Sequence, residues 1–259
     1  MPRIIAVANR KGGVGKTTTT VNVATAMAAA GKKVLVIDLD PQCNASTSLG
    51  IDKHGNMVSS YDVIIGARNL NEAVVWTEIP NFSLVPSSPD LAGAEVELID
   101  KERREFFLQN ALNKTVSQYD YVLLDCPPSL SLVTINALVA ADAVVVPLQC
   151  EYLALEGVSD LISNINLIKK HFNPKLELQG VVLTMYDCRN NLTQMVEEDV
   201  RNFFGKKVYQ TVIPRNVRVS EAPSHGKPVL LYDFKCPGSQ AYISLAGEML
   251  KREKELLAC

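Results

Sequence analysis

The chain has 259 residues and a formal net charge of −2, and its 47% apolar and 21% charged residues are typical of a soluble globular protein. This balance excludes a disordered chain and a fibrous repeat, and the low net charge means that nucleic-acid binding would need a local basic patch. No apolar run is long enough for a membrane-spanning helix, and the first residues lead into a strand-like stretch, not a signal peptide. We therefore expect a cytoplasmic protein.

The six cysteines lie far apart in the sequence, without any C-x-x-C pair. This spacing argues against a disulfide framework and against a zinc or iron-sulfur ligand set. We expect reduced, mostly structural thiols at Cys43, Cys126, Cys150, Cys188, Cys236 and Cys259.

Apolar runs rich in Val, Ile and Leu alternate with segments whose apolar residues have helical spacing, and most of the runs are continuously apolar, as buried parallel strands are. In chain order we predict strand 4–8, helix 17–30, strand 34–37, strand 82–85, helix 101–116, strand 121–124, helix 130–141, strand 143–147, helix 155–171, strand 180–185, helix 192–204 and helix 240–257. The alternation predicts the α/β class: a single doubly wound P-loop domain over residues 1–259, with a mostly parallel central sheet flanked by helices.

The segment 11–18 reads KGGVGKTT, follows the first predicted strand and opens a helix, which is the context that a phosphate loop requires. Its glycines let successive backbone N–H groups converge on phosphate oxygens, and the helix N-terminus adds its positive end. Lys16 places a charge at the β- and γ-phosphates, Thr17 supplies a hydroxyl to Mg²⁺, and Thr18 donates to a phosphate. We therefore predict ATP or ADP with Mg²⁺ as cofactors, bound by Lys11, Gly12, Gly13, Val14, Gly15, Lys16, Thr17 and Thr18.

Acidic residues end two predicted strands, and phosphoryl transfer needs both a carboxylate near the metal and a group that holds the attacking water. Asp125 suits a Walker-B carboxylate that reaches Mg²⁺ through water. Asp38 and Asp40 are two residues apart at the end of the second strand, so both can face the nucleotide edge. We assign Asp40 to the attacking water and Thr17, Asp38 and Asp125 to the metal, although Asp38 and Asp40 can exchange roles. A lone Asp would instead be read as a helix cap or a solvated strand end.

With its additional lysine, Lys11, the loop resembles the deviant Walker-A loop of the ParA/MinD class. Residues 38–42 (DLDPQ), 125–129 (DCPPS) and 213–218 (IPRNVR) narrow the resemblance to the ParA/Soj chromosome- and plasmid-partitioning ATPases, over nearly the whole chain. The resemblance implies a slow ATPase that forms a homodimer in the ATP state, with Lys11 reaching the partner's phosphates. The catalytic residues would be Lys11, Lys16 and Asp40. A lysine in this place acts as an arginine finger does, by stabilising negative charge away from water.

The same resemblance implies an adenine pocket formed by Met185, Pro214, Arg215 and Asn216, with Glu151 near the nucleotide or near the dimer interface. Without the resemblance, Met185 would be read as a core residue and Pro214 as a turn residue.

The resemblance further implies that the ATP dimer binds double-stranded DNA without sequence preference, and that a ParB/Spo0J-type centromere-binding protein accelerates hydrolysis. Arg189 and Arg218 match the expected DNA-binding positions, with Lys227 and Lys235 as weaker candidates. Such binding would be steeply salt-sensitive, because counterion release supplies most of its energy. A lone surface arginine is otherwise read as solvated.

Other functions stay open at this point. A membrane-associated positioning ATPase of the MinD type needs a basic amphipathic C-terminal helix, whereas residues 251–259 carry both charge signs and no aromatic residue, so we expect no membrane partner. An iron-sulfur reductase is disfavoured because paired cysteines are absent, and the sequence shows no second substrate signature for an amide-forming enzyme.

The chain also departs from the pattern of the family it resembles, because Arg10 stands where many relatives are expected to have a glutamine. We also expect no additional N-terminal domain for reading an operator.

Overall fold

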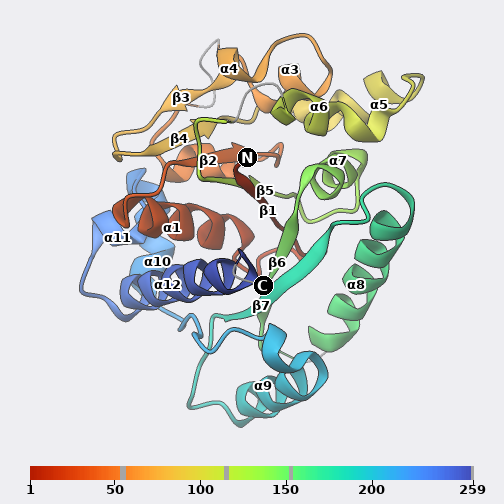
Figure 1. Cartoon of the computed structure of the whole chain (residues 1–259). Coiled ribbons are helices and arrows are strands. Elements are labelled where there is room, and N and C mark those ends of the chain that lie inside the picture. The colour runs from red at the N-terminus through yellow and green to blue at the C-terminus, as the bar shows by residue number, and fades with distance from the viewer. Residues whose placement is uncertain (53–56, 114–116, 152–153, 258–259) are drawn as a thin grey trace.

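A central sheet organises the computed structural model, which describes residues 1–52, 57–113, 117–151 and 154–257 (Figure 1). In this described part, seven strands form one sheet in the order β3-β4-β2-β5-β1-β6-β7. The short edge strand β3 is antiparallel to β4, and every other pair is parallel. The strands are β1 (Arg3–Val7), β2 (Val34–Asp38), β3 (Val75–Trp76), β4 (Phe82–Val85), β5 (Tyr121–Asp125), β6 (Ala143–Gln149) and β7 (Glu177–Thr184).

Helices cover both faces of the sheet, which explains why its inner strands are apolar on both sides. On one face α1 and α12 pack together against the sheet through Met27, Tyr242 and Leu245; on the other face α7 and α8 pack through Leu138 and Leu161 (Figure 1). The helices are α1 (Lys16–Ala29), α2 (Asn44–Ser48), α3 (Ser60–Ile64), α4 (Leu70–Ala73), α5 (Ala94–Leu98), α6 (Phe107–Asn113), α7 (Leu132–Ala140), α8 (Ala154–His171), α9 (Asn191–Phe204), α10 (Val217–Glu221), α11 (Val229–Tyr232) and α12 (Pro237–Leu257).

The predicted doubly wound fold is confirmed, and most predicted elements agree with the structure within three residues at each end. The predicted helix 101–116 is wrong as a single element. Arg103 has a positive φ of 54°, a 3₁₀ turn follows at Arg104–Phe106, and α6 is the only α-helical part of the described residues in that range. The buried Asn136 fixes this break, because its side chain accepts from the N–H of Leu108 and donates to the carbonyl of Arg104. Residues 114–116 lie outside the described residues.

Strand register brings the acidic strand ends to one edge of the sheet. Asp38 of β2 pairs with Asp125 of β5, and Asp125 in turn pairs with Val7 of β1. Because the phosphate loop begins after β1, the loop and both acids meet at the carboxyl edge, where α/β folds bind ligands.

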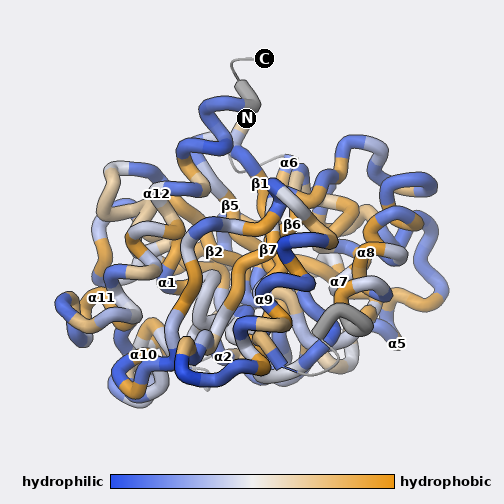
Figure 2. The backbone as a smooth tube through the Cα atoms, turned by 90° about the horizontal axis from the view of Figure 1, so that it is seen from below, coloured by the Kyte–Doolittle hydropathy of each residue, from blue (hydrophilic) through white to orange (hydrophobic). Residues whose placement is uncertain are grey.

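The opposite end of the sheet holds the start of the chain and the end of α12 together. The Nε of Arg3 lies 2.9 Å from a carboxylate oxygen of Glu253, and Arg3 also pairs with Glu177. Figure 2 shows the amino terminus at one end of the molecule and α2 and α10 at the other. Among the described residues, no helix has the length and apolar character required to cross a bilayer.

Candidate nucleotide-binding site

Glycine geometry and two hydrogen bonds hold the phosphate loop in shape. Gly13 and Gly15 adopt positive φ values of 74° and 86°, which residues with a side chain rarely tolerate. The hydroxyl of Thr184 on β7 donates to the carbonyl of Val14 at 2.8 Å and anchors the loop to the sheet. Lys16 Nζ donates to the carbonyl of Lys11 at 3.0 Å, and burial lowers the pKa of Lys16. The lysine therefore lies folded along the loop, with only 7% of the residue exposed.

Asp125 joins the Walker-B strand to the start of α1. One carboxylate oxygen accepts from the hydroxyl of Thr17 at 2.7 Å, and the other accepts from that of Thr20 at 3.0 Å. Complete burial and the nearby carboxylate of Asp38 raise the pKa of Asp125 to about 8. Thr20 was missed by the sequence prediction, although the run of threonines that opens α1 was a signal for it.

Asp38 anchors the loop that follows β2. Its Oδ2 accepts from the N–H and the hydroxyl of Ser46 at 3.0 and 2.9 Å, and its Oδ1 accepts from the N–H of Asp40 at 3.2 Å. Burial raises the pKa of Asp38 to about 6. Asp40 points its Oδ1 at the N–H of Gln42, 2.9 Å away, and is 8% exposed. The structure thus gives Asp38 a positioning contact with α2, and its assignment to the metal stays a prediction.

The residues of this edge fit a hard divalent cation such as Mg²⁺. The hydroxyl of Thr17 and the carboxylate of Asp125 are the oxygen ligands that Mg²⁺ prefers. Asp38 and Asp125 are both fully buried, and the carboxylate of Asp38 raises the pKa of Asp125, so a cation beside them would offset the repulsion between two ionised carboxylates.

A cavity of about 250 Å³ lies beside the phosphate loop and is lined by the residues that were predicted for adenine, whose role stays a prediction. Two backbone hydrogen bonds of Tyr186 hold the 213–215 segment beside the end of β7: its N–H donates to the carbonyl of Ile213 at 2.9 Å, and its carbonyl accepts from the N–H of Arg215 at 3.0 Å. Met185 turns into the cavity from β7 with a φ of 51°. The structure therefore brings together Gly15, Thr18, Met185, Pro214, Arg215 and Asn216.

Six further lining residues were not predicted: Thr184, Ile213, Val219, Ser220, Pro223 and Tyr242. Val219 belongs to α10, Pro223 to the turn after it, and Tyr242 to α12. No local pattern in the sequence marks them as ligand contacts.

Lys11, which was predicted to act across a dimer, is half-exposed and forms an ion pair with Glu151 of the same chain. Asn9 positions the loop here: its Oδ1 accepts from the N–H of Lys11 at 3.0 Å and its Nδ2 donates to the carbonyl of Pro147 at 2.7 Å. Asn9 was missed by the sequence prediction. Arg10 Nη1 lies 2.6 Å from a carboxylate oxygen of Asp160 on α8.

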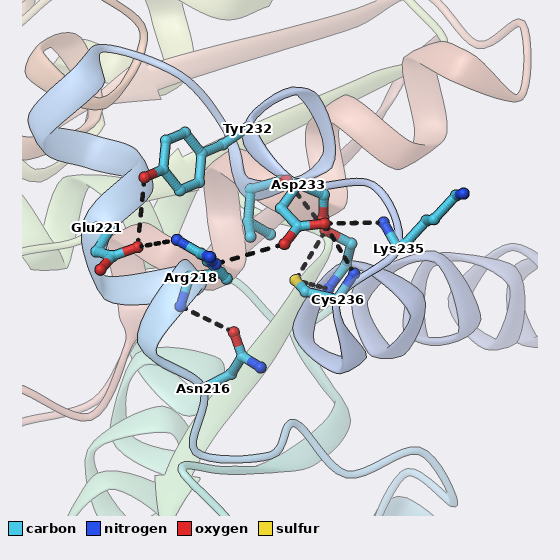
Figure 3. Close-up of polar contacts among 9 residues, drawn as sticks. Asn216, Arg218, Glu221, Tyr232, Asp233, Lys235 and Cys236 are labelled. Carbon is cyan, nitrogen blue, oxygen red and sulfur yellow. Dashed lines mark hydrogen bonds and ion pairs between the residues drawn. The ribbon is translucent and has the colours of Figure 1, made fainter.

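Arg218 lies on α10 between two carboxylates (Figure 3). Its Nη1 is 2.9 Å from Glu221 and its Nε is 3.5 Å from Asp233, while its backbone N–H donates to the side chain of Asn216 at 2.9 Å. Asn216 also lines the cavity beside the phosphate loop, so one short helix connects that cavity to the predicted DNA contact.

The other predicted DNA contacts are exposed and lie on two segments. Lys227 and Lys235 share the 216–236 segment with Arg218, whereas Arg189 is on the loop between β7 and α9. Arg189 pairs with Asp187 at 2.9 Å and is 85% exposed at its side chain. Three of the four basic residues predicted to contact DNA therefore lie on one segment of the described chain.

The fold and the loop define a P-loop nucleoside triphosphatase. A family model described as an AAA domain matches residues 2–178. The chain is 55% identical over 255 residues to the chromosome partitioning protein ParA of Caulobacter vibrioides, covering 98% of this chain and 96% of that protein. It is 50% identical over 249 residues to the sporulation initiation inhibitor protein Soj of Bacillus subtilis, covering 96% and 98%.

A solved structure also matches closely. The crystal structure of cobyrinic acid a,c-diamide synthase from Mycobacterium smegmatis with bound ADP and magnesium has a TM-score of 0.87 and 38% identity, covering 98% of this chain and 96% of that one. The chain belongs to the ParA/Soj family of partitioning ATPases.

Proposed function

We propose that this chain is an ATP-driven DNA-partitioning ATPase whose ATP-bound homodimer holds double-stranded DNA without sequence preference and releases it on hydrolysis. One observation carries the proposal: the cavity beside the phosphate loop is lined both by Gly15 of that loop and by Asn216, which caps the helix that bears Arg218. A nucleotide that contacts Asn216 can therefore change the position of Arg218, a basic side chain suited to contact a DNA phosphate.

The hydrolytic site is proposed to work through preorganised charge. Backbone N–H groups of the loop and Lys16 bind the phosphates of ATP, and Thr17 and Asp125 hold Mg²⁺, with Asp38 behind them. Mg²⁺ supplies charge neutralisation at the phosphates when it is bound. Asp40 orients the attacking water, since the N–H of Gln42 fixes its carboxylate.

Dimer closure is proposed to complete the site. Lys11 leaves Glu151 and reaches the phosphates held by the second copy, where exclusion of water strengthens its charge. The Lys11–Glu151 pair is half-exposed, so breaking it costs little.

The proposed partners are DNA, a second copy of the chain and a ParB-type protein that accelerates hydrolysis. Arg189, Arg218 and Lys227 would contact DNA phosphates, and the protein would act in the cytoplasm on the nucleoid. The two relatives with 55% and 50% identity are a chromosome partitioning protein and Soj, which favours partitioning over the amide-forming activity named for the structural neighbour.

The test is DNA retention by the purified chain without nucleotide, with ADP, and with ATP plus Mg²⁺, at low and physiological salt. We expect retention only with ATP, independent of DNA sequence and lost in Arg218→Ala. Arg68→Ala is the matched control, because Arg68 is another exposed arginine in a carboxylate pair, on a distant segment. Nucleotide-independent retention, or equal loss in both variants, would contradict the proposal. ATP-dependent pelleting with liposomes would instead support a MinD-like positioning ATPase.

A further inference from the structure

A second cavity of about 250 Å³ opens beside the loops that carry the catalytic acids. Its walls are mainly apolar and come from the loops after β2 and β5, from the turn before α5 and from α7. We call it the α5 groove and define it by Leu39, Pro41, Leu91, Glu95, Pro127 and Val133.

Exposed apolar side chains are near neighbours, in the sequence, of residues that line the cavity. Val96 and Ile99 are 75% and 61% exposed, and Leu130, in the loop before α7, is 39% exposed. Glu95 and Ile99 are four residues apart on a helical path, so Ile99 continues the row in which Glu95 lines the groove. Figure 1 shows α5 beside α7 at the outer edge of the molecule. Apolar side chains that gather around a cavity mark a docking surface.

The rim of the α5 groove is acidic. Residues 89–100 contain four acids and no base, and all four are exposed: Asp90, Glu95, Glu97 and Asp100.

The next five residues add three basic residues, Lys101, Arg103 and Arg104, and two acids, so residues 89–105 keep a net charge of −3. The guanidinium of Arg103 lies over the ring of Phe106, 4.9 Å from its centroid, and Arg104 pairs with Glu105 at 3.5 Å. The groove therefore joins an apolar cavity to negative charge, which is complementary to a basic amphipathic segment.

The groove is one loop away from the hydrolytic site. Leu39 and Pro41 flank Asp40 in the sequence, and Pro127 follows Asp125 by two residues. The loop after β5 also lies close to the phosphate loop, since a β-carbon placed on Gly12 would lie 4.0 Å from Cβ of Pro128. An occupant of the groove thus touches both loops whose acids we assign to water and metal.

From this complementarity we infer that the α5 groove docks a basic amphipathic segment of the protein that stimulates hydrolysis. The inference rests on the proposed function, because it assigns a surface to the partner named there. Apolar side chains of the segment fill the cavity, its Lys or Arg side chains face the acidic rim, and its contact with Pro41 and Pro127 shifts the loops of Asp40 and Asp125.

A binding assay tests the chemistry of the groove without the natural partner. The probe is a synthetic amphipathic helix of lysine and leucine, labelled for fluorescence anisotropy, with a glutamate and leucine helix as its charge-inverted control. We expect only the lysine helix to bind, and Asp90→Lys with Asp100→Lys to weaken it about tenfold. Glu198→Lys with Asp199→Lys, an equal charge change on the exposed face of α9, should leave binding unchanged. Equal weakening by both pairs would overturn the inference, because it would show attraction to net charge alone.

A hydrolysis assay with the ParB-type partner tests the functional part. Ile99→Ser should lose most of the stimulation, while ATP-dependent dimerisation, DNA retention and basal turnover match the wild type. Leu167→Ser, which removes another apolar side chain that is 55% exposed on α8, should keep full stimulation. Full stimulation of Ile99→Ser would overturn the inference.

Two outcomes separate this inference from the proposed function. Failure of Ile99→Ser to dimerise with ATP, measured by light scattering, would show that the groove contacts a second copy and would overturn the inference alone. A wild type that neither binds DNA nor responds to the partner would overturn the proposed function. The peptide assay would then still decide whether the groove takes a basic segment.

Discussion

Lys16 and Asp40 lie at the same edge of the sheet but are assigned to different steps, so substitutions at these residues should separate binding from hydrolysis. Lys16→Ala removes the buried charge at the phosphates, and we expect nucleotide affinity to fall about a hundredfold or more. Asp40→Ala leaves the phosphate loop intact, so we expect normal ATP affinity and a trapped ATP dimer. Equilibrium binding of a fluorescent ATP analogue and size-exclusion chromatography measure the two effects. Equal nucleotide affinity in Lys16→Ala and the wild type would refute the first assignment.

Arg218 is partly neutralised by its neighbours, because Glu221 and Asp233 occupy its guanidinium. A DNA phosphate bound by Arg218, as we propose, would compete with these carboxylates. We expect Glu221→Gln to raise DNA affinity about two- to fivefold, which is the range for an exposed ion pair. Titration of labelled DNA with the ATP-bound protein measures the change. Glu72→Gln, which releases Arg68 from a similar pair, should change nothing; unchanged affinity in Glu221→Gln would show that Arg218 does not contact DNA.

At the scale of elements, α12 offers two glycines with opposite expected effects. A β-carbon on Gly238 would lie 2.3 Å from Cγ2 of Val219, a stiff branched side chain on α10. Gly247 is exposed in the same helix, and a β-carbon there meets nothing within 4 Å. We expect Gly238→Ala to lower the free energy of unfolding by about 1–3 kcal/mol and Gly247→Ala to raise it by about 0.5–1 kcal/mol. Urea denaturation of both variants measures the changes, and a shift of the same sign in both would contradict the packing argument.

The long elements were predictable because each carries its own periodicity, as the continuously apolar β2 and the helix α1 after the glycine loop show. The short elements were not, since α2, α10 and β3 span two to five residues and form through contacts with distant parts of the chain. The α2 helix depends on Asp38, whose carboxylate accepts from Ser46. The break before α6 likewise depends on Asn136, about thirty residues further along the chain.

Most of the candidate site was also predicted, because a phosphate loop and strand-end acids are local patterns. Thr20, Asn9 and Tyr242 were missed, since their roles arise only when β5, β6 and α12 come together around the loop. The carboxylate partners of Arg218 could not be read from the sequence for the same reason. The predicted roles of Lys11, of Asp38 and of the basic side chains assigned to DNA binding stay predictions.

At the scale of the whole molecule, two buried acids should make stability depend on pH. The pKa values of Asp38 and Asp125 are raised to about 6 and about 8, above the value of about 3.9 for an unfolded chain. Between pH 4 and 8 the folded chain therefore binds more protons than the unfolded chain at these two groups.

Their contribution to the free energy of unfolding should thus fall as pH rises through this window in the absence of Mg²⁺ and nucleotide. Denaturation at pH 5 and pH 8 measures the slope, and Asp125→Asn should flatten it by removing one titrating group. A slope in Asp125→Asn as steep as that of the wild type would contradict the assignment.

The ion pair between Arg3 and Glu253 has a practical consequence for watching this molecule at work. It holds the first strand and the last helix together at the end of the sheet away from the nucleotide edge. Fluorescent proteins or surface tethers attached at either end of the chain should therefore leave the nucleotide cavity, α10 and the α5 groove open. Two dyes placed at the two ends would report on unfolding rather than on closure, and a sensor of dimer closure should carry its dyes near the loops at the carboxyl edge.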